Sequence, residues 1–243
     1  MGEADLFGLF LGYTQTQTEV DLTNDESDAD NIQFGAYLSH DFDQQLHFNA
    51  IGSVSYLNFE TERSTTLGVA SGDFDGVGFQ GSLELLYDLD PDAETIISPY
   101  VGAEGSLILR DGYSESGAGA LNLSVDDETD EYITTLLGFQ VSGQYDFEDG
   151  PGRGLRVIAG ARAAWGYQLL DTTASTTSAF TAASANTFTT SGPERDRSSF
   201  RGGLNLELIP LNNKDWNVFA QYTVDFNADA QDHILQAGVR FAF

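Results

Sequence analysis

The last nine residues, LQAGVRFAF (Leu235–Phe243), place an apolar side chain at every second position up to the final phenylalanine. Small or polar residues such as Gln236 and Gly238 lie between them. This alternation predicts a β-strand with one apolar and one polar face. Soluble domains usually end in a few loosely held polar residues, whereas this chain ends on an aromatic side chain that continues the apolar face.

The same period of two recurs along the whole chain and predicts an all-β fold without helices. We expect a single domain, residues 1–243, that forms an antiparallel transmembrane β-barrel of about ten strands. The predicted strands are Leu6–Asp21, Ile32–Phe42, Leu46–Glu62, Val77–Leu89, Ile96–Arg110, Tyr132–Phe147, Leu155–Leu170, Ser199–Leu211, Trp216–Phe226 and Asp232–Phe243.

Composition excludes several classes of protein. The chain has 10 Lys and Arg against 38 Asp and Glu, a formal charge of −28, and nucleic-acid binding requires a basic face instead. It has no cysteine, and no apolar run is long enough for a membrane-spanning helix. Residues Met1–Ala4 lack the basic and apolar regions of a secretory signal, and we interpret Met1 as an added initiator.

Two architectures explain strands with one apolar face. In a soluble sandwich the apolar side packs inward, whereas in a membrane barrel it meets lipid and the polar side lines a lumen. The polar faces here carry mostly Gly, Ser, Asn and Gln, not the Lys and Glu of a surface in bulk water. This composition favours the barrel.

Connection lengths also favour the barrel, because outer-membrane barrels have short periplasmic turns and longer external loops. The predicted strands are longer than globular strands, which average about five or six residues. The predicted short connections are Asp43–Gln44, Asp90–Glu94, Asp149–Arg153 and Asn212–Lys214. The predicted long ones are Thr23–Asn31, Thr66–Gly76, Asp111–Glu131 and Thr172–Ser198; Asn227–Gln231 is short but falls on their side.

Aromatic residues on the apolar face lie near both ends of the strands, as two interfacial girdles would. The set beside the short turns is Phe42, Tyr87, Tyr145, Phe147 and Trp216. The set toward the long loops is Tyr13, Tyr56, Trp165, Tyr167 and Phe226.

The scarce cations define the candidate site. Five arginines lie on polar faces within predicted strands, where they avoid lipid and can pair with acids across a lumen. The predicted lumen charge network is Arg110, Arg156, Arg162, Arg201, Arg240, Glu84, Glu104, Glu207 and Asp225.

Glycines on the same polar faces have two interpretations. They permit strong bending under aromatic cover from Phe10, Tyr37, Tyr100 and Phe219, or they fill a narrow interior.

Four stretches, in order along the chain, resemble the C-terminal translocator domain of autotransporters, the type V secretion proteins. They are SGDFDG (Ser71–Gly76), GSLILRDGYSESGAGALNLSV (Gly105–Val125), TTSGPERDRSSFRGGL (Thr189–Leu204) and AGVRFAF (Ala237–Phe243). The resemblance implies a barrel in the outer membrane of a Gram-negative bacterium. It also implies that the barrel-assembly machinery reads the C-terminal strand, with Gly238, Val239, Phe241 and Phe243 as the assembly signal.

The family normally has twelve strands, a helix in the pore and a secreted passenger upstream. Here MGEADLFGLFLGY (Met1–Tyr13) resembles the family's third strand, so two strands, the helix and the passenger are expected to be missing. Ten strands still allow the first and last to pair and close a smaller, narrow barrel. The chain is then either a truncated or engineered barrel without transport activity or a natural short relative. The expected partners are the lipid bilayer and the assembly machinery, with the chain monomeric and no nucleic acid bound.

An outer-membrane hydrolase is the less favoured alternative. It requires a histidine and paired carboxylates at the external rim, where His233 is the candidate, and we predict no enzyme activity. The acidic stretches Thr23–Asp30 and Asp126–Glu131 lack the spacing of a dedicated calcium loop, and a solvated repulsive surface explains them better. We therefore predict no metal, cofactor or catalytic residue.

Overall fold

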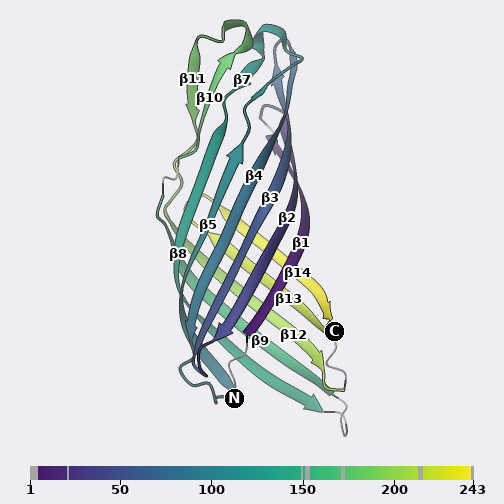
Figure 1. Cartoon of the computed structure of the whole chain (residues 1–243), viewed down its shortest axis with the longest axis vertical. Coiled ribbons are helices and arrows are strands. Elements are labelled where there is room, and N and C mark those ends of the chain that lie inside the picture. The colour runs from purple at the N-terminus through teal and green to yellow at the C-terminus, as the bar shows by residue number, and fades with distance from the viewer. Residues whose placement is uncertain are drawn as a thin grey trace.

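The computed structural model describes residues 5–20, 22–148, 150, 154–170, 173–212 and 216–241. Ten long strands form one antiparallel sheet whose order follows the chain (Figure 1). They are β1 (Asp5–Val20), β2 (Asp25–Asp41), β3 (Leu46–Thr65), β4 (Gly68–Tyr87), β5 (Thr95–Arg110), β8 (Glu128–Glu148), β9 (Gly154–Gln168), β12 (Ser198–Pro210), β13 (Trp216–Phe226) and β14 (Gln231–Phe241). The predicted all-β class and the ten wall strands are confirmed.

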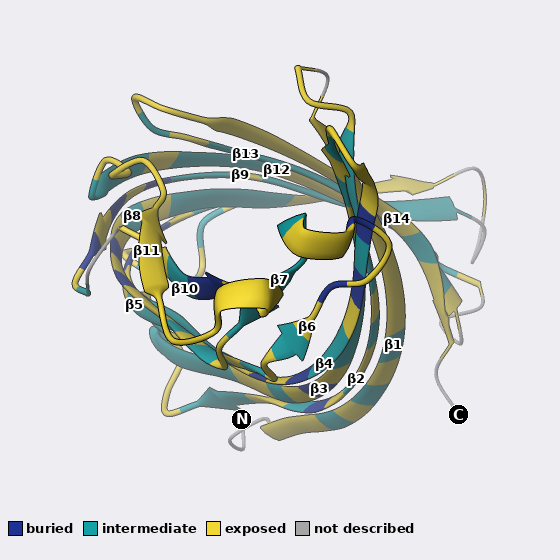
Figure 2. Ribbon diagram, turned by 90° about the horizontal axis from the view of Figure 1, so that it is seen from above, coloured by how far each residue is buried: buried dark blue, intermediate teal, exposed yellow. Residues whose placement is uncertain are grey.

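The sheet curls around a central lumen, and its two edges are β1 and β14 (Figure 2). Within the described residues no backbone pairing joins these two strands, so the sheet is an open barrel. The alternative in which the first and last strands pair to close it does not occur in this structure.

A second, four-stranded sheet lies at one end of the wall, and we call it the cap. Its strands have the order β11 (Thr187–Ser191), β10 (Ser175–Phe180), β7 (Leu123–Val125) and β6 (Tyr113–Ser114). Two single 3₁₀ turns, η1 (Gly119–Leu121) and η2 (Thr181–Ala183), belong to it. The cap comes from the connections between β5 and β8 and between β9 and β12, while both described chain ends lie at the opposite end (Figure 1).

Two of the predicted long loops are wrong. Most of Thr23–Asn31 belongs to β2, and most of Thr66–Gly76 belongs to β4, so tight turns connect β1 to β2 and β3 to β4. Asp28 lies opposite Glu60, and Glu60 lies opposite Asp73. Acidic residues on neighbouring strands disrupt the apolar alternation, although the backbone ladder continues beyond the apolar band.

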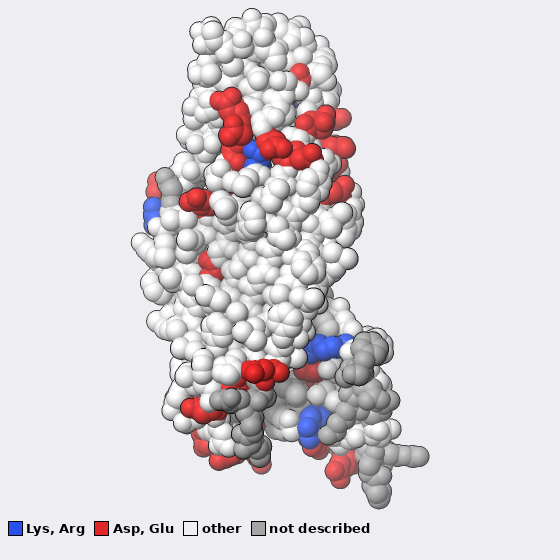
Figure 3. Space-filling model, in the orientation of Figure 1, with Lys and Arg blue, Asp and Glu red and all other residues white. Residues whose placement is uncertain are grey.

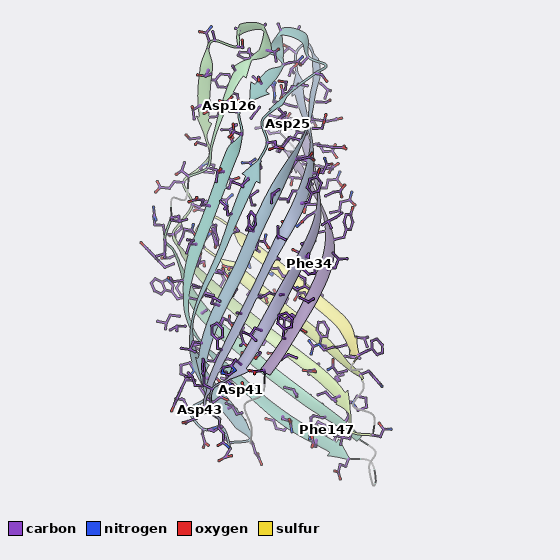
Figure 4. The ribbon with its side chains drawn as sticks, in the orientation of Figure 1. Asp25, Phe34, Asp41, Asp43, Asp126 and Phe147 are labelled. Atoms are coloured by element: carbon purple, nitrogen blue, oxygen red, sulfur yellow. The ribbon has the colours of Figure 1, made fainter. Side chains whose placement is uncertain are left out.

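The wall reverses the burial pattern of a soluble protein. Along β1, Leu11 is 77% exposed and Tyr13 is 64% exposed, and exposed apolar side chains recur on the same face of every wall strand. Phe34 lies at mid-height on β2 (Figure 4). Asp and Glu gather above and below a band of the visible face with little charge (Figure 3). An apolar band around a sheet suits contact with hydrocarbon.

Some of the interior glycines lie directly opposite aromatic residues on neighbouring strands. Four pairs share a register: Gly8 with Tyr37, Gly35 with Phe10, Gly138 with Tyr100, and Gly238 with Phe219. A Cβ added at any of these glycines would clash with the ring. The predicted aromatic cover is confirmed at these four glycines, where the missing side chain creates the space for the ring. Gly12, Gly160 and Gly203 lie against Gln33, Asn205 and Arg162 instead.

Candidate functional site: the charged lumen

The interior face brings arginines and carboxylates together across the curl of the sheet. Arg162 on β9 lies 2.6 Å from Glu84 on β4, although β5 and β8 separate these strands. The Arg162 guanidinium also lies 4.6 Å from the centre of the Tyr100 ring, which is only 2% exposed. This contact crosses the concave side of the sheet, so both side chains point into the lumen.

Arg201 on β12 forms the most extensive interior cluster. Its two terminal nitrogens lie 2.7 and 2.8 Å from the carboxylate oxygens of Glu104 on β5. The guanidinium also donates to Asp225 Oδ2 from Nε at 2.9 Å and from Nη2 at 2.7 Å. Bidentate arginine–carboxylate pairs fix geometry more firmly than single contacts. One cation therefore connects three strands of the wall.

The other three predicted arginines differ in their partners. Arg240 Nη1 lies 3.5 Å from Glu207 Oε1, a long contact with a predicted acid. Arg110 instead pairs with Glu128 at 2.6 Å, and Arg156 pairs with Asp146 at 2.8 Å. The structure thus separates the predicted network into several clusters, and Arg110 and Arg156 bind acids outside the predicted set.

A cavity of about 400 Å³ lies on the interior side of the wall. Polar side chains from neighbouring strands, including Gln33, Gln80, Ser82 and Ser106, line it together with Glu104. Phe10, Ile51 and Tyr132 also line it, so its wall is partly apolar.

The terminal strand presents two different faces. Val239 and Phe241 are exposed on the apolar face, while Gly238 lies under the Phe219 ring. The Arg240 guanidinium lies 5.2 Å from the centre of the same ring. Phe243, the last residue of the predicted assembly signal, lies outside the described residues.

The histidines lie in non-equivalent surroundings. His233 Nδ1 lies 2.6 Å from the Tyr222 hydroxyl oxygen, on the side of the long connections. His47 lies beside the turn at the opposite end, with Nδ1 2.6 Å from Asp41. Among the described residues, no group of three or more His, Asp and Glu side chains is arranged to hold a metal ion.

In the described part of the chain, no helix is long and apolar enough to cross a membrane.

Sequence reasoning did not identify the residues that attach the cap. Arg63 on β3 donates from Nε and Nη2 to the two carboxylate oxygens of Glu115, at 3.0 and 2.6 Å. Tyr113 from β6 stacks on Phe74 of β4, and burial raises its pKa. One sequence signal was available: Arg63 is the only Lys or Arg among the first 109 residues.

Comparisons with known proteins agree with this geometry. The translocator domain of the autotransporter NalP from Neisseria meningitidis is similar at a TM-score of 0.72 and 17% identity, over 99% of this chain and 76% of that one. The beta domain of the Bordetella autotransporter BrkA is similar at a TM-score of 0.67 and 18% identity, over 100% of this chain and 84% of that one. No protein with a curated description matches the sequence. The family model of the autotransporter beta-domain matches residues 1–223, and the chain therefore belongs to that family.

Proposed function

We propose that this chain is the outer-membrane translocator barrel of an autotransporter, whose lumen is the path for a secreted polypeptide. Membership of the beta-domain family supports this function. The observation that carries the proposal is the reversed wall: apolar side chains are exposed outside while the arginines pair with acids inside. Lipid requires such an exterior, and a polar lumen requires such an interior.

The proposed location is the outer membrane of a Gram-negative bacterium, with the chain present as a monomer. The proposed assembly partner is the barrel-assembly machinery, which would bind the terminal strand through Val239, Phe241 and Phe243. The exposed apolar side chains of Val239 and Phe241 support this role. The proposal gives the chain no catalytic function, and it assigns the lumen acids Glu84, Glu104 and Asp225 to ion pairs with Arg162 and Arg201.

Two neighbouring substitutions on β4 test the membrane orientation. Leu83 is exposed on the apolar face, whereas Ser82 lines the interior cavity opposite Glu104. Leu83→Arg places a charge in hydrocarbon and should cost about 2–4 kcal/mol, while Ser82→Arg places its charge on the lumen side, at the interior cavity, and should cost less. Urea unfolding of protein refolded into lipid vesicles measures both.

The companion measurement is conductance of the refolded protein in planar bilayers. A lumen path predicts discrete ion-conducting events. A chain that stays monomeric and soluble without detergent, or equal unfolding costs for Leu83→Arg and Ser82→Arg, contradicts the membrane barrel.

A further inference from the structure

The cap is one folded unit that lies over the external end of the lumen. Backbone pairing of Ser178 with Val125 and of Phe180 with Leu123 joins the two connections that form it. Seen along the wall axis, its strands and 3₁₀ turns project inside the outline of the ring (Figure 2). Because two connections share one sheet, they have to move together.

A cluster of polar contacts holds the cap to the inner side of β3 and β4. The Glu115 side chain is only 5% exposed and accepts both hydrogen bonds from Arg63. Arg63 Nη2 also donates to the Leu121 carbonyl oxygen at 2.9 Å. Ser71 and Ser116 exchange two backbone hydrogen bonds, each of 2.8 Å. Charge-assisted contacts to a nearly buried carboxylate are strong and directional.

An aromatic stack reinforces the same attachment. The ring centres of Phe59 and Phe74, on neighbouring wall strands, lie 4.8 Å apart. The ring centre of Tyr113 in the cap lies 4.4 Å from that of Phe74. Close backbone packing also occurs at Gly117, which has a φ of +99° and lies against the Val69 carbonyl group. Polar, aromatic and backbone contacts thus converge on one side of the cap.

The opposite side of the cap is an unattached edge. All five residues of β11, Thr187–Ser191, are exposed, and among the described residues β11 pairs only with β10. Residues 173–193 carry no charged side chain in a chain with a net charge of −28. This side of the cap therefore has no ion pair like Arg63–Glu115 from residues 173–193.

We propose that the cap is a gate over the external mouth, and that Arg63, Glu115 and Tyr113 form the latch that keeps it closed. The gate rests on the proposed function, because it requires the lumen to be the path. Releasing the latch lets the cap move away from β3 and β4 without breaking the hydrogen-bonded wall, since among the described residues Ser71–Ser116 is the only backbone bridge between the cap and a wall strand. Anything that leaves the lumen at this end meets this unit.

The first test compares two arginine variants at the same end of the barrel. Arg63→Gln breaks the latch, whereas Arg110→Gln breaks a pair of similar length, Arg110 to Glu128 at 2.6 Å, that lies within the wall. Hydrogen exchange of residues 113–125 should be about tenfold faster in Arg63→Gln and unchanged in Arg110→Gln. This readout does not depend on ion flow.

The second test adds a reversible lock. The chain has no cysteine, and the antiparallel Ser71–Ser116 bridge has the close backbone approach that a disulfide requires. Conductance in planar bilayers should rise severalfold in Arg63→Gln, return to the wild-type level when Ser71→Cys and Ser116→Cys are added and oxidised, and rise again on reduction. Ser64→Cys with Val69→Cys, a register pair within the β3–β4 hairpin, is the matched control and should not restore the wild-type level.

The outcomes separate the gate from the proposed function. Equal conductance and equal cap exchange in wild type, Arg63→Gln and Arg110→Gln overturn the gate and leave the pore intact. Faster exchange in Arg63→Gln with no conductance in any variant refutes the lumen path, and the gate with it. If Arg63→Gln fails to fold, Glu115→Gln breaks the same ion pair from the cap side and takes its place in both tests. Cap exchange and conductance equal to wild type in Glu115→Gln then overturn the gate.

Discussion

Single positions in the wall show how packing and lipid exposure divide the two faces of a strand. Tyr100 fills the space above Gly138 and meets the Arg162 guanidinium on its other side. Leu86, Leu136 and Ala164 complete the same small buried cluster. Because the neighbouring position on each strand points to lipid, a substitution is tolerated or rejected according to its face.

Gly138→Ala should destabilise the barrel by about 1–3 kcal/mol, because its Cβ would overlap the Tyr100 ring. A Cβ at Gly138 would lie 2.7 Å from two atoms of that ring and 2.5 Å from the Ala163 carbonyl oxygen. Gly81→Ala is the control, since its nearest contact, to the Ile51 carbonyl oxygen, would be 3.5 Å. Urea unfolding in detergent measures both, and equal losses of stability would contradict the role of the ring.

Asp43 stabilises the turn before β3 in a pH-dependent way. Its carboxylate accepts backbone hydrogen bonds from Gln45 and Leu46, both 2.7 Å, and these bonds lower its pKa. Because the pKa of Asp43 is lower in the folded protein than its usual value of 3.8, the ionised carboxylate stabilises the fold at pH values above 3.8. This stabilisation is lost as the pH falls through the lowered pKa.

The Asp43→Ala variant should therefore have a lower melting temperature than wild type at neutral pH. The two melting temperatures should converge below pH 3.8. Circular dichroism in detergent at a series of pH values follows this difference. A difference in melting temperature that stays constant down to the most acid sample would show that ionisation of Asp43 does not contribute to stability.

At the scale of elements, the wall strands continue well past the apolar band. The Tyr13 hydroxyl donates to Asp30 at 2.6 Å, so the aromatic girdle on this side passes directly into the acidic strand ends. Above this level β2, β3 and β4 meet water outside and the cap inside. Neither environment requires apolar alternation, so backbone hydrogen bonds extend the strands without a sequence signal.

The terminal strand should be the element most sensitive to assembly. Phe241→Ser removes an apolar side chain from the proposed signal, whereas Leu235→Ser removes one from the other end of the same face of β14. We expect the level of Phe241→Ser in the outer membrane to fall severalfold and that of Leu235→Ser to fall much less. Fractionation of cells followed by immunoblotting compares them. Similar levels of the two variants would remove Phe241 from the assembly signal.

At the scale of the whole molecule, the open sheet poses a physical requirement. Both β1 and β14 present backbone N–H and C=O groups that no other described strand satisfies. Unsatisfied backbone groups in hydrocarbon cost several kcal/mol each, so the membrane-embedded protein has to cover these two edges.

Paired cysteines test whether the two edges cover each other. Leu9 lies opposite Ala36 in the register of β1 and β2, so Leu9→Cys with Ala36→Cys should crosslink readily. Leu9→Cys with Val239→Cys spans the open edges and should not crosslink within one molecule. Non-reducing electrophoresis after mild oxidation in vesicles reads both pairs, and an efficient crosslink between positions 9 and 239 would show that the barrel closes on itself in lipid.

The alternation of apolar and polar residues was sufficient to predict the ten wall strands and the two faces of each strand. It also predicted that the arginines within these strands lie on the interior face. Alternation is a local property, because a residue two positions along a strand returns to the same face. Boundaries at the acidic ends of β2 and β4 were missed, since Asp28 and Asp73 gave a loop-like composition to segments that the ladder holds extended.

Tertiary structure alone decided the partners. Glu84 meets Arg162, and Glu104 meets Arg201, only because the sheet curls and brings distant strands face to face. Likewise the Arg63–Glu115 latch joins a wall strand to a connection 52 residues away. The sequence determined which side chains face the lumen, while the curvature of the sheet and the folding of two connections into one cap determined what each of them touches.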